Sequence, residues 1–144
     1  MTTFLIVDTE TTGLASPITA CEIAFIQIDE NLTVLDEQVH LTDPQQPIDP
    51  GAEAIHGISN KQVAGFPDNA TICAKMPQPF VWIGHNAPYD MRVLAQHVNF
   101  NGSICTLATA RRWITGTTNH KLATLQQELG LSSQKSHSAL GDCR

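Results

Sequence analysis

Several patterns are absent from this 144-residue chain, and each absence excludes a class of protein. Its four cysteines form no Cys-x-x-Cys pair, which disfavours a zinc site and a secreted disulfide framework and favours buried free thiols. Long hydrophobic runs are missing as well. The opening MTTFLIVDTE has four consecutive apolar side chains and no basic residue before them, too little for a signal peptide or a membrane span. We therefore expect a soluble cytoplasmic protein with no membrane partner.

Basic residues are scarce, with 8 Lys and Arg against 14 Asp and Glu and a net charge of −6. This balance is unusual for a protein that binds polyphosphate, because nucleic-acid affinity comes largely from Lys and Arg. The charge is uneven, however: residues 1–110 hold 12 acidic and 3 basic side chains, and residues 111–144 hold 2 and 5. Nucleic-acid binding through divalent cations fits this distribution, with a basic flank formed by Arg111, Arg112, Lys121 and Lys135. An ordinary solvated surface explains those basic residues equally well.

The apolar pattern predicts one α/β domain over residues 1–144, since 42% apolar content supports one core of ordinary size. Short β-rich runs predict strands at 3–7, 22–28 and 32–40, the last two forming an antiparallel meander with the first. A proline-rich segment follows, with short helical turns at 53–55 and 60–64. Further on, we expect strands at 80–83 and 104–107 and helices at 89–97, 108–113, 122–129 and from 137 onward. The fold class is therefore a mixed sheet flanked by helices.

The first block of chemical interest is Asp8-Thr9-Glu10, at the end of the first expected strand. Residues two apart on an extended segment point to the same side, so Asp8 and Glu10 can grip one cation together. The alternative is a polar strand end in which Asp8 caps a turn.

The second block is His-Asn-Ala-Pro-Tyr-Asp, which ends at Asp90 near the start of an expected helix. Asp90 would project toward the same end of the sheet, while His85 and Asn86 on the preceding turn could position backbone or substrate phosphates. An acid in the first helical turn also stabilises the helix dipole without any further role.

The third block places His137 five residues before Asp142. On a helix they would lie about 140° apart, so a base could stand beside a metal ligand. A lone histidine would more often be structural or cap a helix, but three blocks together are typical of a two-metal nuclease. Such a site needs several carboxylates around two cations roughly 4 Å apart and a base that deprotonates water. The candidate metal ligands are Asp8, Glu10, Asp90 and Asp142.

The three blocks resemble the exonuclease motifs of the DEDDh (DnaQ-like) 3′-to-5′ exonucleases. The matching stretches are Val-Asp-Thr-Glu-Thr-Thr-Gly-Leu at 7–14, His-Asn-Ala-Pro-Tyr-Asp at 85–90 and His-Ser-Ala-Leu-Gly-Asp at 137–142. The resemblance covers nearly the whole chain. Residues 47–58, 104–106 and 110–113 are similar in particular to the exodeoxyribonuclease X branch.

The resemblance implies a ribonuclease H-like fold and two Mg²⁺ or Mn²⁺ ions. In that family pattern Asp8 bridges both ions, Glu10 and Asp142 complete the first site, and Asp90 supports the second. His137 would be the general base for attack on the last phosphodiester, which releases a nucleoside 5′-monophosphate.

The resemblance also implies a pocket for the terminal nucleotide. Thr11 would hold the 3′-hydroxyl, Leu14 would wedge the last base, and His56 resembles a sugar-contacting histidine. His56 could instead simply close a short helical turn before Gly57. The candidate substrate contacts are Thr11, Thr12, Leu14, His56, His85, Asn86 and Tyr89.

One departure from the family concerns the last helix, which ordinarily continues past the final aspartate. This chain stops at Arg144, so we expect a truncated C-terminal helix that anchors Asp142 weakly.

The leading hypothesis is a metal-dependent exonuclease that acts on single-stranded or frayed 3′ ends of DNA. An RNA-directed exonuclease would use the same residues, since none of them reads the 2′-hydroxyl. The third hypothesis is a binding module that has lost catalysis and acts beside a polymerase or another replication or repair protein. Four mutually repelling carboxylates favour an enzyme over this module, because unpaired they destabilise one another.

Overall fold

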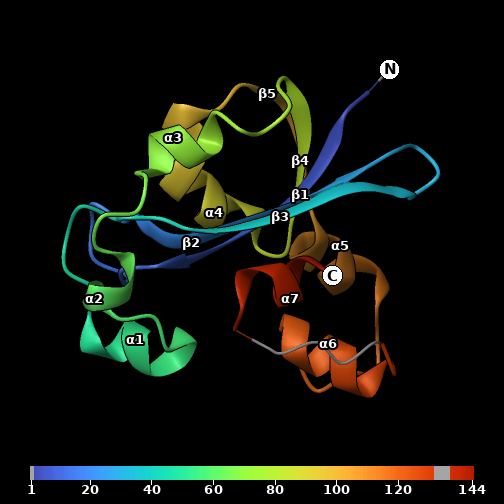
Figure 1. Ribbon diagram of the computed structural model, residues 1–144. Coiled ribbons are helices and arrows are strands. Elements are labelled where there is room, and N and C mark those ends of the chain that lie inside the picture. Colours follow the sequence, from blue (N-terminus) through green and yellow to red (C-terminus); the bar gives the residue numbers. More distant parts are fainter. Residues whose placement is uncertain (1, 132–136) are drawn as a thin grey trace.

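A five-stranded mixed sheet forms the centre of the protein, with strand order β3-β2-β1-β4-β5 (Figure 1). The computed structural model describes residues 2–131 and 137–144. The meander predicted from the sequence is confirmed: β1 (Phe4–Thr11), β2 (Ala20–Ile28) and β3 (Val34–Leu41) pair antiparallel. Strands β4 (Phe80–Gly84) and β5 (Phe100–Cys105) continue the sheet parallel to β1.

Helices cover both faces of this sheet (Figure 1). On one face lie α3 (Asn69–Cys73), α4 (Ala87–Leu94) and the 3₁₀ turn η1 (Ala95–His97). The helices α5 (Thr106–Trp113), α6 (Leu122–Glu128) and α7 (Ala139–Cys143) lie on the other side, and α7 contacts β1 and β2. The short helices α1 (Pro50–His56) and α2 (Asn60–Val63) lie beside the end of the meander.

Strand β1 sends alternate side chains to two separate cores. Leu5 and Val7 join the larger core with Phe25 and Trp82 from the neighbouring strands. Phe4 and Ile6 pack on the opposite face, in the cluster that includes Ala139 and Cys143 of α7. Because side chains alternate along a strand, Asp8 and Glu10 continue the face covered by α7, whereas Thr9 and Thr11 continue the face covered by α4.

Several strand boundaries differ from the sequence prediction, and pairing with a neighbour explains two of them. Strand β1 continues beyond residue 7 to Thr11 because β2 pairs with it as far as Ala20. Strand β5 begins at Phe100 rather than at 104, since pairing with β4 draws residues 100–103 into the sheet. Residue 107 was predicted to end that strand but lies in α5, so this boundary was wrong.

The last helix begins later than the sequence suggested. Helix α7 starts at Ala139, and Ser138 caps it by accepting a hydrogen bond from the amide of Gly141 at 3.3 Å. His137 has a φ of 59°, in the left-handed region, so it precedes the helix. The prediction that His137 and Asp142 share one helix was therefore wrong, and their 140° separation does not apply.

The four cysteines are free, as predicted, and three of them are buried, whereas Cys105 is partly exposed. Within residues 2–131 and 137–144, no helix is long and apolar enough to cross a membrane.

Candidate active site

Three of the predicted carboxylates meet at the end of β1. Asp8 and Glu10 come from β1 and Asp142 comes from α7, and each offers an oxygen within 4.8 Å of the other two. All three side chains are partly buried. Asp142 is more than 130 positions from Asp8 and Glu10 in the chain. It joins them in one acidic cluster because α7 packs on the face of β1 that carries Asp8 and Glu10.

The fourth predicted carboxylate, Asp90, reaches the site from the opposite face of the sheet. Its side chain is only 3% exposed. Its Oδ1 accepts hydrogen bonds from the backbone amide of Thr9 at 3.1 Å and from the Thr9 hydroxyl at 2.7 Å. Asp90 is therefore fixed to the strand between Asp8 and Glu10, outside the group of three but close enough to repel Asp8.

Burial raises the pKa of all four predicted carboxylates, and repulsion by neighbouring carboxylates adds to this for Asp8, Glu10 and Asp90. Burial is the largest cause for Glu10, whose pKa rises to about 7 with further contributions from Asp142, Glu22 and Asp90. Burial raises the pKa of Asp90 to about 7 against the opposing effect of the hydrogen bonds from Thr9. Asp8 has a pKa well above its ordinary value for the same reasons, and Asp142 is raised too.

This arrangement fits divalent cations. Carboxylate oxygens are the ligands that Mg²⁺ and Mn²⁺ prefer, and a doubly charged ion would offset the repulsion that raises these pKa values. Asp8, Glu10 and Asp142 can supply oxygens to one ion, whereas Asp90 could offer only part of its carboxylate to another because Oδ1 is engaged by Thr9.

His137 lies beside Asp142. Its backbone amide hydrogen-bonds to the Asp142 carboxylate, and its imidazole lowers the pKa of that carboxyl against the dominant effect of burial. The side chain is exposed and borders a cavity of about 520 Å³ that also contains Asp142. This cavity is basic, since its lining includes His85, Arg111, His120 and Lys121.

A second cavity, of about 820 Å³, opens on the Glu10 side of the acidic cluster. Its size lies within the range of about 300–1,000 Å³ typical of small-molecule sites. Four of the predicted substrate contacts line it together with Glu10: Thr11, Leu14, His56 and Tyr89. We call this cavity the terminal pocket.

Hydrogen bonds fix the polar side chains of the terminal pocket. The hydroxyls of Thr11 and Tyr89 lie 2.7 Å apart. His56 Nε2 donates to the carbonyl of Thr11 at 3.0 Å, and its Nδ1 accepts from the amide of Ile58 at 3.0 Å. Because both ring nitrogens already have hydrogen-bond partners, the His56 ring offers the pocket no free N–H donor.

The loop after β1 presents Leu14 to solvent, with 82% of its side chain exposed. Gly13, before it, has a φ of 145°, and a Cβ there would lie 2.3 Å from an Asp49 carboxylate oxygen. Only glycine permits this approach, so Gly13 fixes the loop that carries Leu14 against the start of α1.

Three predicted substrate residues lie outside the terminal pocket. Thr12 is buried, and its hydroxyl accepts from Gln46 Nε2 at 3.0 Å. His85 Nε2 donates to the carbonyl of His120 at 2.8 Å, and its Nδ1 lies 3.0 Å from the Thr106 hydroxyl. Asn86 has a φ of 65° at the start of α4. Thr12 and His85 thus have internal partners, and His85 also lines the basic cavity beside Asp142.

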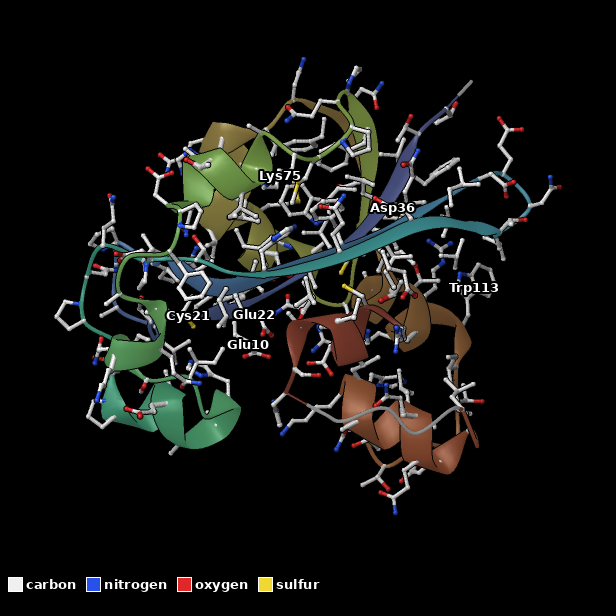
Figure 2. The ribbon with its side chains drawn as sticks, in the orientation of Figure 1. Glu10, Cys21, Glu22, Asp36, Lys75 and Trp113 are labelled. Atoms are coloured by element: carbon white, nitrogen blue, oxygen red, sulfur yellow. The ribbon has the colours of Figure 1, made fainter. Side chains whose placement is uncertain are left out.

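Two residues of the site were not identified from the sequence. Thr9 was read only as the spacer between two acids, although it anchors Asp90. Glu22 lies directly opposite Glu10 in the register of β1 and β2 (Figure 2). Pairing the two predicted strands residue by residue could have placed Glu22 opposite Glu10. The sequence pattern, however, does not specify which residues of the two strands pair.

Comparison with known proteins identifies the family of the chain. A family model described as exonuclease, of the RNase T type, matches residues 5–144. The chain is 33% identical to exodeoxyribonuclease 10 of Escherichia coli K12 over 143 residues, which cover 96% of this chain and 62% of that protein. It is 30% identical to a DNA polymerase III subunit epsilon-like protein of Rhodobacter capsulatus, over 97% of this chain and 22% of that protein. The chain thus spans less than two thirds of these relatives.

Solved structures show the same similarity. Exonuclease X in complex with 5′ overhanging duplex DNA superimposes with a TM-score of 0.84 and 32% identity, covering 97% of this chain and 84% of that chain. Escherichia coli exonuclease I in complex with a dT13 oligonucleotide gives 0.83 over 99% of this chain and 39% of its own, at 20% identity, which supports the fold alone. These matches agree with the ribonuclease H-like fold, and the chain belongs to the exonuclease family.

Proposed function

We propose that this chain is a metal-dependent 3′-to-5′ exonuclease that removes nucleotides from the end of a DNA strand. The observation that carries the proposal is the acidic cluster of Asp8, Glu10 and Asp142, with oxygens within 4.8 Å of one another, between two cavities of different character. Apolar residues such as Leu14 and Ile55 line the terminal pocket, whereas Arg111 and Lys121 line the cavity on the Asp142 side. A nucleotide base suits the first and a phosphate backbone suits the second.

Two divalent cations, Mg²⁺ or Mn²⁺, are the proposed cofactors. Asp8, Glu10 and Asp142 would hold one ion, and Asp8 and Asp90 would hold the other. When bound, such ions stabilise negative charge on phosphoryl oxygens and lower the pKa of water.

His137 is the proposed general base. It is exposed and lines the same cavity as Asp142, from which its imidazole would take the proton of a water molecule beside the cluster. Histidine is the side chain most often used as a general base in catalysis. The nearby Asp142 carboxylate would stabilise the resulting imidazolium.

The terminal pocket would take the 3′-terminal nucleotide. Leu14 offers an exposed apolar side chain against which a base can pack, and the paired hydroxyls of Thr11 and Tyr89 can meet the sugar. A pocket of this kind at one side of the cluster is filled most easily by a single-stranded or frayed end.

DNA is the proposed substrate because the similar exonuclease X structure contains DNA and the E. coli relative is named an exodeoxyribonuclease. The relative named after DNA polymerase III makes a replication or repair protein a reasonable partner to test. The proposed catalytic residues do not read the 2′-hydroxyl, so matched DNA and RNA oligomers test this preference. Equal or faster cleavage of RNA would overturn it.

The direct test is cleavage of a 5′-labelled single-stranded DNA with Mg²⁺ or Mn²⁺, with and without EDTA. We expect shortening from the 3′ end and release of 5′-mononucleotides only when metal is present. Asp8→Ala should lower the rate by at least about 10³-fold, since metal-ion stabilisation amounts to several kcal/mol. His137→Ala should lower it by about 10²- to 10⁴-fold.

The matched control for the histidine is His97→Ala, because His97 lies in η1 and outside both cavities. This variant should cleave at the unaltered rate. Metal-independent cleavage, or full activity of Asp8→Ala, would contradict the proposed function.

A further inference from the structure

Glu22 is an acid beside the proposed active site that the mechanism does not use. It lies on β2, directly opposite Glu10 of β1, and both residues point to the side of the sheet where α1 and α7 lie (Figure 2). Glu22 is not one of the three carboxylates whose oxygens come within 4.8 Å of one another. Its charge helps to raise the pKa of Glu10, so its position next to the cluster is electrostatically unfavourable.

The contact that Glu22 makes is with the start of α7. Its Oε1 accepts a hydrogen bond from the backbone amide of Ala139 at 2.9 Å. Ala139 is the first residue of the helix and is fully buried, so its amide has no carbonyl four residues earlier within the helix to bond. The carboxylate satisfies that amide and places negative charge at the positive end of the helix.

Helix α7 needs such an anchor because it is short. Its five residues are far fewer than an isolated helix requires to be stable in water. The packing of Ala139 and Cys143 on β1 and β2 supplies part of its stability. At its other end, Arg144 forms an ion pair with Glu37 of β3 at 2.7 Å, but both side chains are substantially exposed, so this pair contributes little.

The anchor lies one helical turn from a proposed metal ligand. Asp142 follows Ala139 by three residues, and its backbone amide donates to the carbonyl of Ser138 at 2.9 Å. His137, on the other side of Ser138, donates its amide to the Asp142 carboxylate. A displacement of the helix start would therefore move both Asp142 and His137 relative to β1.

We propose that Glu22 is a positioning residue that fixes the start of α7 to β2 and thereby holds Asp142 and His137 against Asp8 and Glu10. Glu22 itself contacts neither cation nor substrate. This role rests on the proposed function for its consequence in catalysis, but the positioning can be measured without any reaction.

Two substitutions separate positioning from metal binding. Glu22→Gln keeps a carbonyl oxygen that can accept from the Ala139 amide and removes the charge, whereas Glu22→Ala removes both. The readouts are Mn²⁺ affinity by calorimetry in the absence of substrate, and amide hydrogen exchange at Gly141 and Asp142. Glu30→Ala is the charge control, because this exposed acid lies beyond the opposite end of β2.

We expect Glu22→Ala to weaken Mn²⁺ binding on the order of 10- to 100-fold, as is typical when a residue that orients a metal ligand is lost. Amide exchange in α7 should become faster by a similar factor. Glu22→Gln should stay within about threefold of the unaltered chain in both measurements, as should Glu30→Ala, and DNA cleavage at limiting Mn²⁺ should follow the same order.

A Glu22→Gln variant that loses as much Mn²⁺ affinity as Glu22→Ala would overturn the proposal, because the charge and not the acceptor would then matter. Unaltered affinity and exchange in Glu22→Ala would overturn it as well. Should Glu22→Ala fail to fold, Glu22→Gln alone decides between the two roles. If the unaltered chain cleaves no DNA, the proposed function fails, while the Mn²⁺ and exchange measurements still test the positioning.

Discussion

At Glu10, burial and three neighbouring carboxylates set the charge state of the site. A carboxyl whose pKa is higher in the folded than in the unfolded protein binds more protons when folded. Such a carboxyl stabilises the folded protein fully at a pH below its ordinary pKa. This stabilisation is lost as the pH rises through the pKa of the folded state. For Glu10 this window runs from 4.5 to about 7.

Glu10→Gln should therefore be more stable than the unaltered chain at pH 8 in EDTA. We expect a gain of about 1–2 kcal/mol in the free energy of unfolding, after solvent screening is allowed for, and no gain at pH 4. Thermal unfolding followed by circular dichroism measures both. Glu30→Gln, at an exposed turn, should leave the unfolding temperature unaltered at both pH values. Equal stability of Glu10→Gln and the unaltered chain at pH 8 would show that the carboxylates repel each other less than their burial implies.

Leu14 is a second residue whose role is local. Its side chain is 82% exposed, so Leu14→Ala should leave the unfolding temperature nearly unaltered. If the terminal base packs against it, the KM for single-stranded DNA should rise about 5- to 30-fold, the equivalent of losing part of one buried leucine contact. Leu32→Ala is the matched control, since Leu32 is 77% exposed in the turn between β2 and β3. A KM that both variants leave unaltered would exclude the wedge role of Leu14.

Helices α5 and α6 and the loop between them carry the basic side of the site. Arg111 and Lys121 line the cavity that contains Asp142, and the part of the chain that the structure describes offers them no ion-pair partner. Cations that contact the DNA backbone release counterions, so each contact steepens the salt dependence of binding.

Arg111→Ala and Lys121→Ala should each weaken binding of single-stranded DNA and make the slope of log affinity against log salt shallower by about 0.7. Fluorescence anisotropy with a catalytically inactive Asp8→Asn background measures this. Arg112→Ala serves as the control, because the Arg112 guanidinium lies 5.2 Å from the ring centroid of Trp113 and outside the cavity. A slope that changes equally in all three variants would assign the effect to net charge rather than to this cavity.

Metal binding should couple distant parts of the whole molecule, since the proposed ligands come from β1, α4 and α7. A ligand that binds only the folded state stabilises it by about 2.7 kcal/mol at a concentration 100 times its Kd. We expect Mn²⁺ to raise the unfolding temperature by several degrees and EDTA to reverse the rise. The Mn²⁺ effect should be lost in Asp142→Asn and kept in Asp36→Asn, an exposed acid of β3. A rise that persists in Asp142→Asn would place the ion elsewhere.

Local patterns in the sequence predicted much of this protein. Short β-rich apolar runs predicted the three-stranded meander and the mixed sheet, since the preference of such runs for strands is a local property. The spacing of Asp8 and Glu10 predicted that both face one side, and the structure confirms their proximity to Asp142. Four of the residues matched to the family pattern, including Leu14 and His56, line one pocket.

Other features depend on which segments become neighbours, and only the tertiary structure decided them. Strand β5 begins four residues earlier than expected because β4 pairs with it, and no local signal marks that pairing. Helix α7 begins at Ala139 because Ser138 and Glu22 cap it, although His137 continues the same motif in sequence. Residues of the same type differ in the same way: His137 is exposed at the basic cavity, whereas His85, which also lines it, has both ring nitrogens engaged by internal partners. The sequence by itself determined which side chains are candidates for the chemistry, because residue type and strand period are local. The tertiary structure decided which of them lie together, because strand register and helix packing join residues that the chain holds far apart.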